Sequence, residues 1–241
     1  YMFRVNYDYN NKYLLTVSGR WDGASQLAEG NKWAFFPSAA LGWRLDQEEF
    51  LKDVTWLNQL KFRLGVGVTG NSAIDPYQTK GAIVSLYYPF GSALAPGYAA
   101  SEPLIKDGAV AMANKNLSWE KTTQYNIGLD YSVLNGRISG VLDFYTSRTT
   151  DLLMAMTIPS LNGYTNTYAN VGKTSNIGVD ITLNTVNVKT RDFEWSTSIN
   201  AAWQKDKIDE LANGKEDDIN NNWFIGQALG VIYGYECGGL W

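Results

Sequence analysis

Hydrophobic and polar residues alternate with a period of two along most of this chain, a pattern typical of β-strands with one apolar and one polar face. The alternation is clearest in four segments, at 60–69, 123–131, 176–184 and 193–203. It is less regular at 1–9, 13–21, 34–44 and 137–148, and a ninth, weaker pattern covers 228–236. We therefore expect eight strands, with a ninth as an alternative.

The lengths of these strands and of their connections favour a membrane barrel. Most of the strands run for about 9–13 residues, whereas a tilted strand that crosses a bilayer needs about 9–11 and the mean strand of a soluble protein has about 5–6. Tight turns at 9–12 and 134–137 alternate with long connections at 22–33, 70–115, 150–172 and 206–226. Bacterial barrels alternate periplasmic turns and extracellular loops in this way. The sequence thus predicts an all-β, antiparallel transmembrane β-barrel with extracellular long loops.

The composition agrees with a barrel. Aromatic residues make up 14% of the chain and charged residues only 18%, against about 25% charged in ordinary soluble domains. Amphipathic rings favour the headgroup zone of a membrane, and several lie near expected strand ends: Tyr1, Tyr13, Trp21, Trp43, Tyr131, Tyr145 and Trp195. A soluble carbohydrate-binding β-sandwich with an aromatic core is the alternative on pattern alone.

Charge and residue types exclude several functions. A net charge of −4 argues against a nucleic-acid surface. The chain has no histidine, so it cannot itself supply a Ser-His-Asp site or the usual zinc ligands. Cys237 stands alone and cannot form an internal disulfide. We therefore expect no catalytic residue here, and an outer-membrane hydrolase would need a site elsewhere.

Three patterns that resemble sites have structural explanations. The glycines at 65, 67 and 70 match G-x-G-x-x-G, but no helix is expected after them. Residues 218–222 begin like a calcium loop, yet Trp223 and Leu229 stand at its glycine and glutamate positions. Asp46, Glu48 and Glu49 resemble the acidic start of a short helix more than a catalytic carboxylate pair. We expect no cofactor and no metal, and only a looser loop calcium site is left open.

Several segments resemble the C-terminal barrel of SusC/RagA-type TonB-dependent transporters. They occur in order, with the variable parts in the long loops: 10–25, 36–44, 60–65 with 69–71, 116–121, 143–145 and 226–235. The resemblance implies a 22-stranded barrel filled by an N-terminal plug. These 241 residues are then expected to form about eight of its strands, with no plug, signal peptide or TonB-contacting box among them.

The resemblance also implies a function. Such proteins import oligosaccharides or peptides across the bacterial outer membrane, driven by the inner-membrane TonB complex. A SusD-like surface lipoprotein covers the barrel, and dimers of such pairs are expected. The alternative is a stand-alone eight-stranded barrel that serves as an adhesin or structural anchor. Side chains would have to fill the interior of such a small barrel.

Two groups of residues are candidates for binding. Lys61 and Arg63 fall on the polar face of their strand and are expected to face the lumen, because a charge facing lipid at mid-depth costs about 2–4 kcal/mol. We expect them to pair with acidic plug residues or to meet passing substrate. The 70–115 connection carries aromatic residues between restraining prolines. These residues are expected to bind sugars, to dock a protein partner or to pack on the rim: Tyr77, Tyr87, Tyr88, Phe90 and Tyr98.

Overall fold

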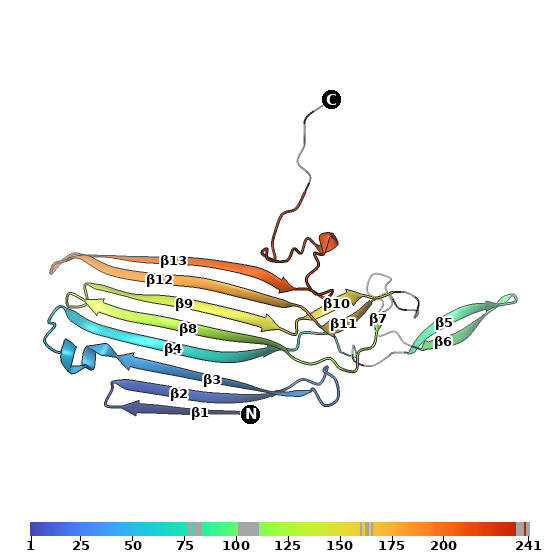
Figure 1. Ribbon diagram of the computed structural model, residues 1–241, viewed down its shortest axis with the longest axis horizontal. Helices are drawn as coiled ribbons and strands as arrows, with labels where there is room; N and C mark the ends of the chain where they lie inside the picture. Colours follow the sequence, from blue (N-terminus) through green and yellow to red (C-terminus); the bar gives the residue numbers. More distant parts are fainter. Residues whose placement is uncertain are drawn as a thin grey trace.

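An eight-stranded antiparallel sheet dominates the computed structural model, which describes residues 1–76, 79, 83–100, 111–159, 161, 164, 166–234 and 239. Figure 1 shows the strands side by side in the order β1-β2-β3-β4-β8-β9-β12-β13. They are β1 (Met2–Tyr9), β2 (Tyr13–Gly23), β3 (Trp33–Arg44), β4 (Leu57–Asn71), β8 (Glu120–Val133), β9 (Ile138–Thr150), β12 (Lys173–Lys189) and β13 (Glu194–Glu210). The eight strands that the alternation predicts are confirmed.

Two smaller sheets lie in connections that the sequence presented only as loops. β5 (Ile83–Phe90) and β6 (Ala93–Ala100) form a hairpin, and β10 (Leu153–Thr157), β11 (Asn166–Asn170) and β7 (Ala111–Met112) form a three-stranded sheet. Figure 1 shows the hairpin projecting from the end of the main sheet. The long connections therefore carry structure of their own.

The ninth strand is a wrong prediction within the described part of its range. Residues 228–234 form no strand, and 235–236 lie outside the described residues. Two of the apolar side chains there are largely uncovered, since Leu229 is 52% and Ile232 99% exposed. The backbone N–H of Leu229 bonds to the side chain of Asp206 at 3.0 Å instead of to a neighbouring strand.

Short and long connections gather at opposite ends of the main sheet (Figure 1). At the short-turn end, Asn10 and Asn11 have φ of +54° and +53°, and Asn135 and Gly136 have φ of +58° and +78°. Both central residues of a type I′ turn need positive φ, which these residue types tolerate. The β3–β4 link at the same end contains two short 3₁₀ helices, η1 (Leu45–Gln47) and η2 (Glu49–Leu51).

One face of the sheet is apolar across all eight strands. Directly opposite residues of antiparallel strands share a face, and the register aligns Leu15 with Leu41, Leu41 with Leu64, and Leu64 with Ile127. The face is well exposed and includes Phe3, Val5, Leu15, Val17, Leu41, Leu64, Val66, Ile127, Leu142, Phe144, Ile181 and Ile199. A soluble monomer rarely exposes so extensive an apolar patch, whereas the outer face of a membrane barrel does.

Aromatic rings border this apolar face at both ends. Tyr13 stacks on Tyr9 and Trp43 at the short-turn end, with ring centroids 6.4 and 6.5 Å apart. Trp21 meets Phe35 at 5.2 Å near the other end. Trp21 follows Tyr13 by eight positions along β2, a distance of about 26 Å, or about 20 Å of height at a tilt of about 40°, comparable with the apolar band of about 25 Å in outer-membrane barrels.

Tyr145 does not belong to these girdles, which corrects its assignment to a strand end. It lies in the middle of β9, in register with Gly178 of β12, and its ring covers that glycine. Because Tyr145 shares the face of Asn126 and Ser147, it lines the polar side of the sheet. Its pairing with Gly178 depends on register, which the chain pattern does not reveal.

The main sheet is open, with β1 and β13 at its two edges and no pairing between them in the described residues. A closed eight-stranded barrel would need that pairing. The buried core is small and lies at the long-connection end, where Ala24, Leu27, Phe36 and Trp119 pack together. No helix among the described residues is long and apolar enough to cross a membrane.

Candidate functional site on the polar face

Arg63 joins three strands on the polar face. Its Nε donates to Asp130 Oδ1 on β8 at 2.9 Å, and its Nη2 donates to both carboxylate oxygens of Asp143 on β9, at 3.0 and 3.1 Å. All three side chains are about a quarter to a third exposed. Arg63 needs no acidic residue of a plug to balance its charge, because Asp130 and Asp143 already do so.

Gly128 makes this arrangement sterically feasible. It lies on β8 in register with both Arg63 and Asp143. A Cβ at this position would come within 2.6 Å of Arg63 Nη2 and of Asp143 Oδ1, closer than van der Waals contact allows. The guanidinium therefore crosses β8 over Gly128, where no side chain stands in its way.

Lys61 borders a hollow on the same face. The hollow measures about 240 Å³ and is lined by Thr16, Gly42, Lys61, Arg63 and Asn126, among others. The stem of Lys61 lies over Gly42, and its ammonium forms no ion pair with any of the described residues. Of the two cations predicted to face the lumen, Lys61 is thus the one that can form an ion pair with a group outside the described residues.

The polar face also carries hydroxyl and amide groups that bond between strands. The pairs are Thr16 with Asn6 at 2.9 Å, Ser18 with Ser38 at 2.7 Å, Thr122 with Thr149 at 2.8 Å, Thr182 with Asn200 at 2.9 Å and Ser198 with Asn184 at 2.7 Å. Each such group keeps spare donor or acceptor capacity. This surface can form many weak, uncharged hydrogen bonds with a polar solute.

The acidic group in the β3–β4 link braces the turn end of the sheet. Glu48 accepts hydrogen bonds from Trp43 Nε1 at 3.0 Å, the Tyr13 hydroxyl at 2.8 Å and Lys12 Nζ at 3.3 Å. These bonds, led by that from Trp43, hold the pKa of the Glu48 carboxyl below its usual value.

Asp46 has a similar structural role. Burial raises the pKa of its carboxyl, but hydrogen bonds from Arg44, Gln47 and the Leu60 backbone N–H outweigh this and hold the pKa below the usual value. Each carboxylate is thus committed to its own donors, which agrees with a structural and not a catalytic interpretation.

The other two site-like patterns are also part of the scaffold. Gly65, Gly67 and Gly70 lie inside β4, paired with β8, so no helix N-terminus follows them for a nucleotide phosphate. Asp218 accepts from the backbone and side-chain amides of Asn221, and Asp217 accepts from the Ile225 backbone N–H. The described part of the chain contains no group of three or more metal-ligating side chains.

Four of the five aromatic residues predicted as binding candidates in the 70–115 connection belong to the projecting hairpin. Tyr87 and Phe90 lie on β5 and are 69% and 81% exposed. Tyr88 and Tyr98 have backbone positions in β5 and β6, whereas Tyr77 lies outside the described residues. None of residues 81–101 is charged, so the exposed surface of the hairpin is neutral and rich in apolar groups.

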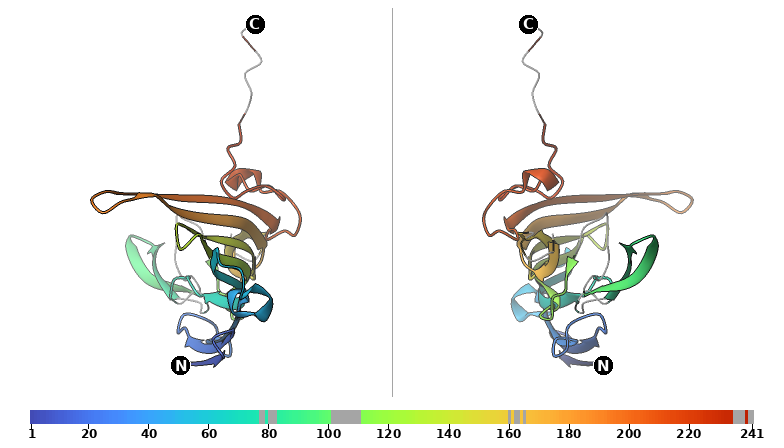
Figure 2. Two further views of the ribbon diagram at one scale, coloured as in Figure 1. Left: turned by 90° about the vertical axis from the view of Figure 1, so that its left-hand side faces the viewer. Right: turned by 90° about the vertical axis from the view of Figure 1, so that its right-hand side faces the viewer.

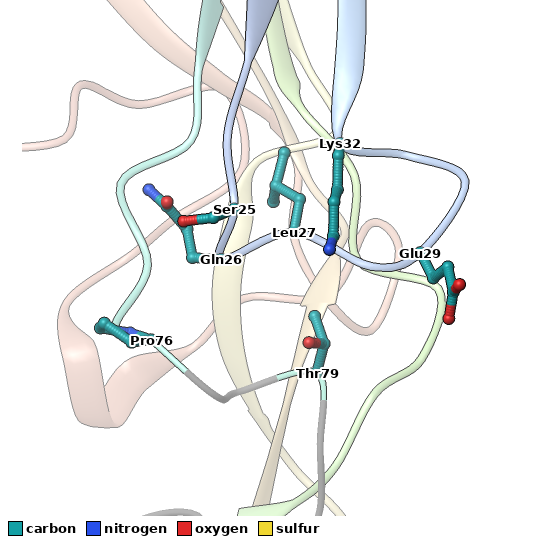
Figure 3. A pocket seen from close by; sticks show the side chains of 7 residues that line it. All are labelled: Ser25, Gln26, Leu27, Glu29, Lys32, Pro76 and Thr79. Atoms are coloured by element: carbon teal, nitrogen blue, oxygen red, sulfur yellow. The ribbon is translucent and has the colours of Figure 1, made fainter.

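A pocket of about 350 Å³ lies at the long-connection end, and nothing in the sequence pattern singled it out. It is lined by Ser25, Gln26, Leu27, Glu29, Lys32, Pro76 and Thr79. Figure 3 shows Lys32 extending into it above Thr79. The Gln26 amide fixes one wall by donating to the Ser72 carbonyl at 3.0 Å. The pocket is formed by two loops, at 25–32 and 76–79, which only the fold brings together.

Sequence comparison places the chain among known receptors. A family model described as "TonB dependent receptor-like, beta-barrel" matches residues 1–235. The chain is 40% identical over 228 residues to the TonB-dependent receptor SusC of Bacteroides thetaiotaomicron, covering 90% of this chain and 21% of SusC. It is 34% identical over 249 residues to the TonB-dependent receptor P3 of Formosa agariphila, covering 99% of this chain and 24% of P3.

Structural comparison agrees. The RagAB peptide importer in its open-open state matches with a TM-score of 0.83 and 29% identity, covering 94% of this chain and 24% of that one. The structure of the RagAB peptide transporter matches with a TM-score of 0.79 and 28% identity, over 94% and 24%. The chain thus spans about a fifth to a quarter of the relatives it matches.

Proposed function

Because the chain belongs to the TonB-dependent receptor-like β-barrel family, we propose that it forms part of the wall of an outer-membrane importer for oligosaccharides or peptides. The observation that carries this proposal is the two-sided main sheet. Its apolar face suits contact with lipid tails, and its opposite face offers hydroxyl and amide groups to a polar solute. Together these features suit a wall between lipid and a hydrophilic lumen, with the long connections on the extracellular side.

In this proposal the residues of the chain guide cargo and perform no chemistry. The hydroxyl and amide groups of the polar face exchange hydrogen bonds with passing sugars or peptide groups, so that no single contact holds the cargo tightly. The Arg63 cluster pins β4, β8 and β9 together, which keeps the wall rigid while a plug moves. Lys61 is the group we assign to an acidic residue of that plug. Energy from the TonB complex enters through other parts of the protein, and no enzymatic activity or cofactor is assigned to these residues.

A SusD-like lipoprotein is the proposed partner of the long connections. A lone two-stranded hairpin is marginally stable in water, yet β5–β6 projects with Tyr87, Phe90 and Leu94 well exposed. Aromatic anchors of this kind often dominate binding energy at protein interfaces. We therefore assign the hairpin to docking of the lipoprotein over the barrel, in preference to sugar stacking. Two such pairs would form the dimer.

Purification of the tagged full-length protein from outer membranes tests this assembly. We expect a lipoprotein to copurify in about equal amount, and a Phe90→Ala, Leu94→Ala double variant to lose most of it. Phe50→Ala is the matched control, because Phe50 is 69% exposed at the opposite end of the sheet. The docking role of the hairpin would be contradicted if the double variant retained the lipoprotein, or if the control lost as much of it as the double variant.

A further inference from the structure

β10 presents a free edge in the described structure. It is the outer strand of the sheet β10-β11-β7. The backbone N–H of Val171 donates to the Leu152 carbonyl at 2.9 Å, which sets the phase of the β10–β11 pairing. Since backbone groups alternate in direction along an antiparallel strand, Met154 and Met156 bond toward β11, and Leu153, Ala155 and Thr157 turn outward.

Within the part of the chain that the structure describes, only one of these outward backbone groups has a hydrogen-bond partner. The Leu153 N–H donates to Glu120 Oε2 at 3.3 Å. The N–H and C=O groups of Ala155 and Thr157 have no hydrogen-bond partner among the described residues, and both residues are exposed. An edge of this kind is a template for another extended strand.

A groove of about 730 Å³ runs along this edge. It touches four consecutive residues, Met154 to Thr157, and because side chains alternate between the two faces of a strand, a groove in contact with all four follows the edge. The opposite wall is the segment after β13, including η4 (Ile219–Asn221) and Trp223. Figure 1 shows that segment above β10. The volume is in the range of about 300–1,000 Å³ that is typical of ligand sites.

The groove wall is acidic. Glu216, Asp217 and Asp218 line it, and none of its described lining residues is a lysine or arginine. Asp217 and Asp218 also accept local hydrogen bonds, but these donors are neutral amides and form no ion pair with the carboxylates. Such a wall attracts a cationic guest and repels an anionic one.

We propose that this groove binds an extended peptide with basic side chains, which pairs as an added strand with β10. Backbone pairing at Ala155 and Thr157 would supply affinity for any extended peptide. The three carboxylates would select basic side chains, and Met154, Met156 and Trp223 would contact the apolar ones. An oligosaccharide lacks the regular N–H and C=O spacing, of about 7 Å per two residues, that this edge matches. This inference rests on the proposed import function and names a cargo class for it.

A peptide-binding measurement tests the proposal. A labelled peptide of alternating lysine and valine, about eight residues long, is added to the full-length protein in detergent, and binding is followed by fluorescence anisotropy. Ala155→Pro removes an outward N–H without breaking the bonds to β11, since proline is tolerated at strand edges. We expect at least about tenfold weaker binding, with Ala155→Ser as the matched control that keeps the N–H. Equal binding by the two variants would overturn the proposal.

Changes to the peptide keep the test valid if the proline variant misfolds. Methylation of alternate backbone nitrogens, with side chains unchanged, should abolish binding to the wild-type protein. Glu216→Gln should weaken binding several-fold, whereas Asp192→Asn, an exposed acid in the β12–β13 turn, should not. Undiminished binding of the methylated peptide would overturn strand addition.

Failure of this inference can be told apart from failure of the import function. If no peptide binds but TonB-dependent uptake of an oligosaccharide persists, the groove proposal is wrong and the importer stands. If the peptide binds with the expected variant pattern but nothing is taken up, the groove stands and import is wrong.

Discussion

Arg63 on β4 reaches across the whole of β8 to Asp143 on β9, with its Nη2 3.0 and 3.1 Å from the two carboxylate oxygens. Such a link between strands that are not neighbours is feasible because the residue between them is Gly128. β4 is thereby fixed on the polar face to the β8–β9 hairpin, whose two aspartates lie 67 and 80 positions further along the chain.

Gly128→Ala should destabilise the folded protein. The added Cβ would lie 2.6 Å from Arg63 Nη2 and from Asp143 Oδ1, so the guanidinium must move away from its partners. Overpacking of this kind costs about 1–3 kcal/mol. The unfolding midpoint in denaturant, measured on the full-length protein in detergent, should fall accordingly.

Gly65→Ala is the control for that experiment. Gly65 lies on the same face of β4, but the nearest atom to its added Cβ is Asn126 Cβ at 3.9 Å, an ordinary contact. We expect little change in the midpoint. A loss as large as that of Gly128→Ala would show that any glycine substitution on these strands destabilises, independently of Arg63.

A double-mutant cycle over Arg63→Gln and Asp143→Asn should reveal direct coupling. Each single change leaves a half-buried charge short of a partner, whereas the double change removes both charges. We expect a coupling energy in the range of about 0.5–3 kcal/mol. Additive effects of the two substitutions on the unfolding free energy would contradict the contact.

Charge on the apolar face should be costly. Leu64→Lys introduces an ammonium in the middle of the exposed apolar surface of β4, where a lipid-facing lysine costs about 2–4 kcal/mol. Gln124→Lys on the polar face of β8 is the control. Folding yields into lipid vesicles should drop for the first variant alone. Equal yields would mean that this face does not meet lipid.

Low pH should loosen the short-turn end of the sheet. The hydrogen bonds from Trp43, Tyr13 and Lys12 hold the pKa of Glu48 below its usual value, so they stabilise the fold fully above the unfolded-state pKa of about 4.3. That contribution is lost as the pH falls through the lower folded-state pKa.

Stability measured from pH 7 down to pH 3 tests this effect. We expect the wild-type protein to lose stability below about pH 4.3 and Glu48→Gln to show a weaker dependence, because its side chain does not titrate. An identical pH profile in both would refute the role of Glu48.

The strands were predictable from the sequence because each carries its own signal. From Leu60 to Thr69 every second residue is apolar, and β4 includes that whole segment. The turn at Asn10 and Asn11 was predictable for the same reason, since the residue types suit positive φ. Both features depend on residues that are close in the chain.

The interactions across strands were not predictable in this way. That Arg63 bonds to Asp130 and Asp143 follows from register, which pairs residues about 70–80 positions apart. Both aspartates do occupy polar-face positions of their strands, which was the available signal. Tyr145 and the pattern at 228–236 misled for the complementary reason, because neither the residue that an aromatic ring covers on the next strand nor the presence of a neighbouring strand is encoded locally.

Uptake of labelled cargo by intact cells tests the central claim most directly. Cells with the full-length gene, cells without it and cells that lack TonB would be compared for accumulation of a labelled oligosaccharide and a labelled peptide. The proposed importer predicts accumulation of at least one of them only when both the gene and TonB are present. Equal accumulation without the gene, or full accumulation without TonB, would contradict it.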